Sequence, residues 1–453
     1  MSPSQPTLIE RVAELFPDRV SRILVAVSGG VDSVVLLHVL KTVSSESGCE
    51  LHVAHLDHQL RQESHDDADF VADLCQRWEL PCHIESCNVQ ALANQDRISL
   101  EMAGRKARQT FLSGVAEIID ADLIALAHHR DDQAETFMLR LIRGTGQSGL
   151  TCMYRRQSLW WRPLLDCDRE EILAYARQHG LHWVEDRSNQ DQAFLRNRIR
   201  TQIMPQMKAM NPRSGVRIAE TVQQLQLEEN FWQDLISDVF PRLLVSDDDG
   251  LRLSRPGLID LHQALRFRIY REALRRVRGD LQKIELVHLR AIENMLLSSK
   301  TQAQLDLPDC WVARRYESLW IRNSAPVLSS AFVAQLLIPG ETVLPNGQVL
   351  RASLQNEQEG ESQYVAEFAY SQLEQPVSLR YWQAGDSFAP QGMGGHKKLK
   401  RYFSDQKIEL EVRANALVLL GGETILWVVG MRRSRHAPAS MQAEKILRLE
   451  LIR

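Results

Sequence analysis

Hydrophobic residues in the first third of the chain form short continuous runs, separated by longer amphipathic or polar stretches. Four of these runs predict buried strands: Ile23–Val27, Leu51–His55, Cys82–Glu85 and Leu123–Ala127. The stretch Val31–Leu40, which follows the first run, is long enough for a helix. Strands of this kind that alternate with helices are typical of a parallel sheet covered on both faces. We therefore predict an α/β fold for a first domain over residues 1–212.

Two further patterns follow in the rest of the chain. Val216–Leu235 and Leu261–Val277 carry apolar residues at helical spacing, which predicts a helical domain over residues 213–325. Residues 330–453 instead alternate short apolar runs with turns, and the glycine pair at 421–422 between two such runs is a hairpin signal. We therefore predict three domains, of which the last is a small α+β domain.

The sequence Ser28-Gly29-Gly30-Val31-Asp32-Ser33 lies where the first predicted strand turns into the first helix. This position directs free backbone N–H groups and the positive end of the helix dipole at one spot, which makes it an anion site. The loop lacks the lysine of a Walker A loop and the third glycine of the dinucleotide fingerprint. What remains resembles the PP-loop of the ATP pyrophosphatases, which bind the pyrophosphate of ATP and adenylate a carbonyl oxygen.

The composition of the chain is typical of a globular protein. The chain has 453 residues, of which 44% are hydrophobic and 25% charged, as in ordinary globular proteins. No apolar stretch approaches the roughly 20 residues of a membrane span, and the N-terminus has no secretory pattern. We therefore expect a cytoplasmic protein that does not bind a membrane. The seven cysteines are scattered without a Cys-x-x-Cys pair, which favours reduced thiols over a zinc or iron–sulfur site.

Positive charge is concentrated locally, although the net charge of the chain is −4. Residues 192–217 contain six basic residues and no acid, and residues 380–435 contain ten basic residues against five acids. Such patches attract phosphate, although solvated helix faces have the same composition. The second patch includes a run of cations: Lys397, Lys398, Lys400 and Arg401. Because Tyr402 and Phe403 follow directly, we predict phosphate contacts beside an aromatic surface, with a solvated loop as the alternative.

Polar residues follow three of the predicted strands, at the sheet edge where parallel sheets bind their ligands. Ser28 follows the first strand, the run His55–Arg61 ends the second, and His128–Asp132 follows the fourth. The second run suits polar recognition of adenine, ribose or a base, and His55 is its first candidate. A metal site formed by the two histidines of that run is the alternative.

Asp131, Asp132 and Glu135 crowd the first turns of the helix that follows the fourth strand. The helix dipole favours some acid at this position, but three carboxylates behind two histidines exceed that need. Their mutual repulsion requires Mg²⁺ or a cationic ligand to offset it. We therefore predict a cation site here, with a purely structural helix start as the alternative.

Arginines form two further candidate phosphate contacts. Arg105 and Arg108 share one face of a predicted helix, where an intrahelical salt bridge between Glu101 and Arg105 is the structural alternative. The second group lies in a stretch without acids, which favours contact with phosphate over a solvated surface. Its members are Arg196, Arg198 and Arg200.

Six motifs occur in the order seen in the tRNA(Ile)-lysidine synthase family, which the chain therefore resembles. They are the loop at 28–33, His-x-Asp-His-x-Leu-Arg at 55–61, His-x-x-Asp-Asp-Gln-Ala-Glu-Thr at 128–136, Arg-Pro-Leu-Leu at 162–165, Asp-x-Ser-Asn at 186–189 and Arg-Asn-x-Ile-Arg at 196–200. Gly385–Pro390 and Lys397–Phe403 look like parts of that family's last domain. The chain departs from the pattern at Gly104, where members more often have alanine, and after Phe403, where the usual proline and tryptophan are missing.

The resemblance implies a bacterial enzyme that uses ATP and Mg²⁺ to join free L-lysine to C2 of the first anticodon cytidine of an isoleucine tRNA. The substrate tRNA has a CAU anticodon, and its base is adenylated before the ε-amine of lysine displaces AMP. The product changes the identity of the tRNA from methionine to isoleucine. The oligomeric state stays open, with a homodimer among the alternatives.

Residue roles follow from this resemblance together with side-chain chemistry. Ser28–Ser33 and His55 are expected to bind ATP, and Asp32 is expected to bind Mg²⁺ and to be catalytic. Asp132 and Glu135 are expected to receive the ammonium group of lysine and assist its deprotonation, because a protonated amine is no nucleophile. Asp131 completes the expected lysine site. The expected tRNA contacts are Arg105, Arg108, Arg196, Arg198, Arg200, Lys397, Lys398, Lys400 and Arg401.

Two other classes of function fit parts of the sequence. A different PP-loop enzyme is the first, such as a tRNA thiolase or an amidotransferase-coupled nucleotide synthetase. It needs paired catalytic cysteines or a nucleophilic cysteine with a histidine, and the sequence makes neither evident. A non-catalytic tRNA-binding or stress protein with a degenerate nucleotide pocket is the second, and the intact Asp32, Asp132 and Glu135 argue against it.

Overall fold

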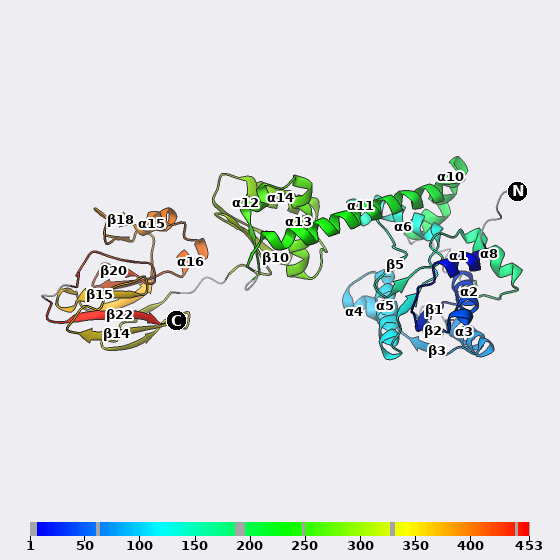
Figure 1. The fold of residues 1–453 in the computed structure, drawn as a ribbon, viewed down its shortest axis with the longest axis horizontal. Helices are drawn as coiled ribbons and strands as arrows, with labels where there is room; N and C mark the ends of the chain where they lie inside the picture. Colours follow the sequence, from blue (N-terminus) through cyan, green and yellow to red (C-terminus); the bar gives the residue numbers. More distant parts are fainter. Residues whose placement is uncertain are drawn as a thin grey trace. The chain divides into compact units, whose positions relative to one another are not determined.

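The computed structural model describes residues 7–59, 64–185, 195–246, 250–326, 331–439 and 443–452. The chain divides into two compact units, Met1–Asp234 and Leu235–Arg453 (Figure 1). Within the described ranges, no helix is both long enough and apolar enough to cross a bilayer.

The first unit is built on a six-stranded sheet in the order β3-β2-β1-β4-β6-β5. Its strands are β1 (Arg22–Ala26), β2 (Glu50–Asp57), β3 (Cys82–Ser86), β4 (Leu123–Ala125), β5 (Arg156–Gln157) and β6 (Trp160–Trp161). Neighbouring strands are parallel, except that β5 is antiparallel to β6. The predicted parallel sheet is confirmed. Because β1 lies between β2 and β4, the polar segments that follow these three strands meet at one edge.

Helices cover both faces of this sheet, and α2 fills the segment after the predicted phosphate loop. The helices are α1 (Leu8–Glu14), α2 (Val31–Ser47), α3 (Ser64–Trp78), α4 (Val89–Asp96), α5 (Leu100–Ile118), α6 (Arg130–Arg143), α7 (Gln147–Leu150) and α8 (Arg169–Gln178). Ile23 and Val25 of β1 pack in one core with α1, α2 and α8, whereas Leu24 packs against α5. Burial on both faces explains why β1 is continuously apolar.

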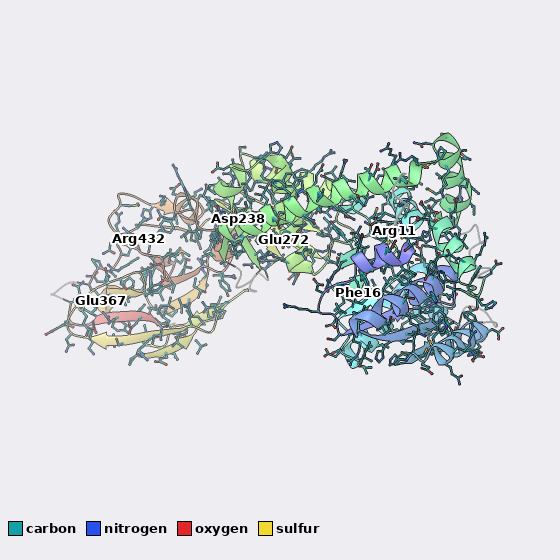
Figure 2. The ribbon with its side chains drawn as sticks, turned by 45° about the vertical axis from the view of Figure 1, so that its right-hand side comes forward. Arg11, Phe16, Asp238, Glu272, Glu367 and Arg432 are labelled. Atoms are coloured by element: carbon teal, nitrogen blue, oxygen red, sulfur yellow. The ribbon has the colours of Figure 1, made fainter. Side chains whose placement is uncertain are left out.

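Helix α1 and the turn that follows it are each fixed to the first unit by one contact. Arg11 Nη2 lies 2.9 Å from Glu171 Oε1 on α8, and the ring of Phe16 meets that of Trp161 edge to face at a centroid distance of 5.9 Å. Figure 2 labels Arg11 and Phe16 at this position. The N-terminal helix therefore belongs to the core that supports β1.

The end of the first unit packs against α6. Its elements are α9 (Leu195–Arg198), the π-helical turn η2 (Ile199–Ile203), α10 (Met204–Met210) and α11 (Ser214–Leu243), which continues into the second unit. Ile199 and Met204 share a buried cluster with Ala134 and Leu139 of α6. This packing sets η2 beside the helix that carries the predicted acidic cluster.

The second unit begins with a five-stranded antiparallel sheet in the order β7-β8-β11-β10-β9. Its elements are β7 (Leu244–Ser246), β8 (Leu251–Ser254), α12 (Arg255–Ile259), α13 (Gln263–Arg278), α14 (Leu286–Leu297), β9 (Gln302–Leu307), β10 (Cys310–Arg315) and β11 (Ser318–Arg322). The helical pattern is confirmed by α11 and α13, but the sheet was not predicted. Strand β10 is buried along its whole length, including Arg314 and Arg315. The guanidinium group of Arg314 donates to the Ser298 carbonyl, and that of Arg315 donates to the Ala303 carbonyl. The two arginines interrupt the apolar pattern that is typical of a buried strand.

A buried charged network joins α13 to α14. Arg266 Nε lies 3.0 Å from Glu293 Oε2, and the Tyr270 hydroxyl donates to the same oxygen over 2.7 Å. Burial opposes ionisation of Glu293, which is only 4% exposed. The hydrogen bonds from Arg266 and Tyr270 outweigh that effect and hold the pKa of Glu293 below its usual value.

We expect Glu293→Ala to lower the free energy of unfolding by about 3–5 kcal/mol, because it leaves the Arg266 guanidinium buried without its counter-charge. The stabilisation by the carboxylate is fully present above the pKa of an unfolded glutamate, and it is lost as pH falls through the lower folded pKa. Denaturant titrations at neutral and acid pH measure both effects, with the exposed Glu317→Ala as control. A gap between wild type and Glu293→Ala that stays constant in acid would contradict this account.

The remainder of the second unit contains two sheets that pack face to face through one apolar core. The strand orders are β12-β16-β19-β20-β21 and β13-β14-β22-β15, and β17 pairs with β18. The strands are β12 (Val333–Gln335), β13 (Gly340–Val343), β14 (Val349–Gln355), β15 (Val365–Ala369), β16 (Val377–Tyr381), β17 (Ser387–Phe388), β18 (Lys397–Lys398), β19 (Leu417–Gly421), β20 (Thr424–Val428), β21 (Arg432–Arg433) and β22 (Ile446–Ile452). The helices are η3 (Tyr370–Gln372), α15 (Leu399–Asp405) and α16 (Leu410–Ala414). The predicted hairpin is confirmed by β19 and β20.

Candidate active site

The loop between β1 and α2 has the geometry of an anion site. Gly29 has φ +86°, a left-handed conformation that glycine adopts without strain, and Gly30 is the N-cap residue of α2. The Ser33 hydroxyl donates to the Gly30 carbonyl over 2.8 Å and accepts from the Ser28 N–H at 3.2 Å. Ser33 thus braces the loop from inside, while Ser28 is exposed at its mouth.

Asp32 lies in the first turn of α2, and its side chain is 30% exposed. Its Oδ2 is 3.8 Å from His129 Nε2, whereas its Oδ1 is buried without a hydrogen-bond partner among the described residues. Burial raises the pKa of Asp32, and the positive fields of His129 and Arg169 offset part of that increase. A buried carboxylate oxygen with a free lone pair, next to a phosphate loop, fits the oxygen ligands that Mg²⁺ prefers.

His55 supports this loop from the neighbouring strand. His55 is 4% exposed, and its Nδ1 lies 2.8 Å from the carbonyl oxygen of Val27, the residue that follows β1. Beyond β2, Arg108 Nη2 of α5 approaches His58 Nε2 at 3.4 Å. Burial, together with the charge of Arg108, lowers the pKa of His58 to about 4, so its ring is neutral near pH 7. The predicted residues Leu60 and Arg61 lie outside the described residues.

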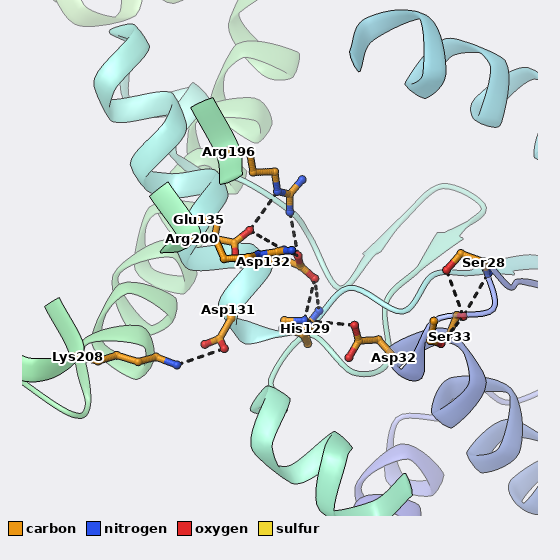
Figure 3. Close-up of polar contacts among 11 residues, drawn as sticks. Ser28, Asp32, Ser33, His129, Asp131, Asp132, Glu135, Arg196, Arg200 and Lys208 are labelled. Carbon is orange, nitrogen blue, oxygen red and sulfur yellow. Dashed lines mark hydrogen bonds and ion pairs between the residues drawn. The ribbon is translucent and has the colours of Figure 1, made fainter. Parts of the chain in front are cut away.

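The acidic cluster of α6 is offset by arginines from the same chain. Arg196 Nε lies 3.1 Å from Glu135 Oε2, and Arg200 Nε lies 2.6 Å from Glu135 Oε1. Both guanidinium groups also reach Asp132 Oδ1, at 2.9 and 3.4 Å (Figure 3). Arg196 and Arg200 therefore have acidic neighbours in space, although their own stretch of sequence contains no acid. The expected need for Mg²⁺ or a cationic ligand to offset the cluster is wrong for this reason.

Asp131 points to a different partner from the other two carboxylates. Its Oδ2 lies 3.3 Å from Lys208 Nζ of α10, and Figure 3 shows this pair apart from Asp132 and Glu135. Lys208 belongs to the basic stretch but is not among the predicted site residues. Only the fold that returns α10 to the start of α6 reveals the pairing.

His129 connects the loop to the acidic cluster. Its Nε2 lies 3.5 Å from Asp132 Oδ2 and 3.8 Å from Asp32 Oδ2, and its backbone N–H donates to Asp132 over 3.1 Å. Burial opposes ionisation of Asp132, but the charges of His129 and Arg196 and this N–H outweigh it and lower the pKa of Asp132. One histidine therefore contacts a carboxylate of each predicted subsite.

The remaining predicted cations of the first unit are exposed. Arg105, Arg108 and Arg198 have open side chains on α5 and α9, and Glu101 lies 3.9 Å from Arg143 Nη2. Glu101, the partner of Arg105 in the structural alternative, therefore pairs with Arg143 instead. The motif residues at 186–189 lie outside the described residues.

The basic run of the second unit lies on β18 and α15. Lys398, Lys400 and Arg401 are exposed, while Lys397 Nζ pairs with Asp405 Oδ2 at 2.7 Å. The predicted aromatic surface beside this run is wrong, because Tyr402 and Phe403 are 6% and 0% exposed. Both rings face inward on α15, where helical spacing alternates them with the exposed cations.

Three family profiles match the chain, and together they span most of its length. The PP-loop domain matches residues 4–207, the TilS substrate binding domain residues 253–320, and the TilS substrate C-terminal domain residues 377–451. Among solved structures, the U34-tRNA thiolase NcsA from Methanococcus maripaludis matches 48% of this chain and 77% of its own, at 19% identity and a TM-score of 0.42.

Curated relatives match the chain almost end to end. The tRNA(Ile)-lysidine synthase of Geobacter sulfurreducens is 37% identical over 441 residues, which cover 94% of this chain and 93% of the relative. The enzyme of the same name from Bacteroides thetaiotaomicron is 31% identical over 445 residues, 98% of both chains. The chain with this nucleotide loop and acidic cluster belongs to the tRNA(Ile)-lysidine synthase family.

Proposed function

We propose that this protein ligates L-lysine to C2 of the first anticodon cytidine of an isoleucine tRNA with a CAU anticodon, at the expense of ATP. One observation carries the proposal: His129 Nε2 lies within 4 Å of both Asp32 and Asp132. This geometry supports the proposal, because it links the nucleotide loop to the carboxylates to which we assign the amine. Membership of the family supports the choice of cytidine as the base and lysine as the amine.

In the first step, the C2 carbonyl oxygen of cytidine attacks the α-phosphorus of ATP and pyrophosphate leaves. Backbone N–H groups of the loop at 28–33 and the start of α2 receive the phosphates, and His55 holds the loop through Val27. Asp32 would hold Mg²⁺ through its unpartnered oxygen. The ion supplies positive charge that offsets the charge of the leaving pyrophosphate.

In the second step, the neutral ε-amine of lysine attacks C2, the C2–O bond breaks, and AMP leaves. Asp132 and Glu135 attract the ammonium form and accept its proton, since only the neutral amine has a lone pair for attack. Asp131 has the smaller share, because its carboxylate lies apart from Asp132 and Glu135, beside Lys208 (Figure 3). The resulting base pairs with adenine rather than guanine, so the tRNA identity changes from methionine to isoleucine.

Recognition of the tRNA is assigned to cations on both units. In the first unit these are Arg105, Arg108, Arg196, Arg198 and Arg200, and in the second Lys397, Lys398, Lys400 and Arg401. Phosphate contacts of this kind position the substrate without reading its sequence. The reaction takes place where ATP, lysine and tRNA are available, and we assign it to the cytoplasm.

The test follows ATP labelled at the α-phosphate. With purified isoleucine tRNA and lysine, we expect AMP and pyrophosphate to form in equal amounts. Without lysine, pyrophosphate release is expected to continue only to one adenylated base for each tRNA. Pyrophosphate release that needs no tRNA would place the protein with the nucleotide synthetases that share this loop and overturn the proposal.

The double change Lys398→Ala with Lys400→Ala is expected to weaken tRNA binding and leave ATP binding unchanged. For every phosphate that these lysines neutralise in the wild-type complex, the salt dependence of the binding constant should flatten by roughly 0.9 on a logarithmic plot. Affinities measured across a salt series test this, and exposed lysines outside the run, Lys300→Ala with Lys445→Ala, form the control. An unchanged slope would mean that Lys398 and Lys400 do not bind tRNA.

A further inference from the structure

The proposed seat for the lysine ammonium is already filled by cations of the chain. Both oxygens of Glu135 accept from Arg200, and Oε2 also accepts from Arg196. Asp132 Oδ1 accepts from Arg196, while Oδ2 accepts from the His129 N–H. Every oxygen of the two carboxylates therefore has a donor in the structure described (Figure 3).

The charges of this cluster disfavour binding of an ammonium group while both arginines remain in place. The carboxylates of Asp132 and Glu135 and the two guanidinium groups sum to zero, the nearby charge of Asp32 is opposed by that of Arg169, and the Glu135 side chain is only 3% exposed. An ammonium that enters without displacing an arginine leaves one excess positive charge in a poorly solvated place, which is unfavourable. Lysine can therefore bind at full strength only after a guanidinium group has withdrawn.

The backbone conformation of η2 suggests how the Arg200 guanidinium group withdraws. Arg200 lies in η2, a π-helical turn between α9 and α10, where Met204 N–H bonds to the Ile199 carbonyl. Single π turns within helices recur at functional sites. Conversion of η2 to α-helix shifts the register by one residue, which rotates a side chain by about 100° around the axis. Such a rotation would carry Arg200 away from Glu135.

We propose that Arg196 and Arg200 are exchangeable counter-ions, which occupy the ammonium seat until substrate displaces them and then become free to contact tRNA phosphate. This inference rests on the proposed function, since it requires lysine to bind at Asp132 and Glu135. The two arginines then determine the order in which tRNA and lysine bind. Lysine is held weakly by the free protein and strongly once the arginines have moved to tRNA.

Equilibrium dialysis of labelled L-lysine against the full-length protein, without ATP or tRNA, tests the exchange. If the closed pair dominates, apparent affinity is reduced by the fraction of open protein. Arg196→Met and Arg200→Met should therefore each bind lysine about tenfold or more tightly than wild type. Arg200→Lys, which retains a cation, should bind as weakly as wild type. Unchanged or weaker lysine binding by both methionine variants would overturn the proposal, as would an equal gain in Arg200→Lys.

Two controls separate this inference from the function beneath it. Arg217→Met removes an exposed arginine that is paired with Glu220, and it should leave lysine affinity unchanged. If Glu135→Gln leaves lysine binding intact, the ammonium seat itself is wrong and the proposed second step fails. If Glu135→Gln abolishes binding while the arginine variants bind as wild type does, only the exchange is wrong.

A third measurement keeps the proposal testable if one methionine variant folds poorly. Saturating tRNA should raise the affinity of the wild-type protein for lysine, and lysine should raise its affinity for tRNA by the same factor. Either folded methionine variant should lose most of this coupling. Wild-type protein without any coupling would contradict the exchange.

Discussion

Asp32→Asn is expected to lower tRNA-dependent pyrophosphate release by roughly two to three orders of magnitude, the usual cost of removing one charge-stabilising group from a transition state. The side chain is part-exposed, and its carboxylate lies 3.8 Å from His129. Asparagine has the same shape, so the fold should be retained. Pyrophosphate release measured beside a thermal melt separates the two effects.

The control for this change is Asp73→Asn, which removes an exposed carboxylate from α3 of the same unit. It should alter neither the rate nor the melting temperature. Full pyrophosphate release by Asp32→Asn would show that Asp32 does not serve the nucleotide. A large fall in melting temperature would show that Asp32 serves the fold instead.

Glu135→Gln is expected to slow transfer of the amine by roughly two to four orders of magnitude while adenylation is much less affected, because proton transfer to a positioned base contributes that much. Adenylated tRNA should then accumulate. Rapid-quench measurements resolve the two steps, and Asp131→Asn is the matched change on the same helix. Since Asp131 lies beside Lys208 and apart from Asp132 and Glu135 (Figure 3), its effect should be smaller.

The ratio of the adenylation rate to the amine-transfer rate in Glu135→Gln tests the role that we assign to Glu135. Equal loss of adenylation and transfer would place Glu135 on the nucleotide rather than the amine. A larger effect of Asp131→Asn than of Glu135→Gln would likewise reverse our assignment within the acidic cluster.

The centre of the sheet in the first unit was predictable because β1 and β4 are buried on both faces. Val25 and Leu24 of β1 belong to opposite cores, so the apolar run is unbroken and its length alone indicates a strand. The loop after it was predictable because glycine and a helix start define an anion site locally. Both features could be predicted because each depends on residues that are close together in the sequence.

The pairing of Arg196 and Arg200 with the acidic cluster could not be predicted, because it joins residues 61 to 68 positions apart. Sequence spacing reports neighbours on one helix, and a stretch without acids gave no sign that α6 supplies them. The first sheet of the second unit was missed for a similar reason. Strand β10 buries Arg314 and Arg315 against backbone carbonyls, so its charged residues resemble those of a solvated helix.

Mass spectrometry of tRNA nucleosides tests the central claim most directly. The protein is incubated with ATP, isotopically labelled L-lysine and isoleucine tRNA with a CAU anticodon, and the tRNA is then digested to nucleosides. Our account predicts a new nucleoside with the mass of cytidine joined to labelled lysine with loss of water, formed only when ATP is present. Absence of this nucleoside, while wild-type protein still releases pyrophosphate, would contradict lysine as the amine that attacks the activated base.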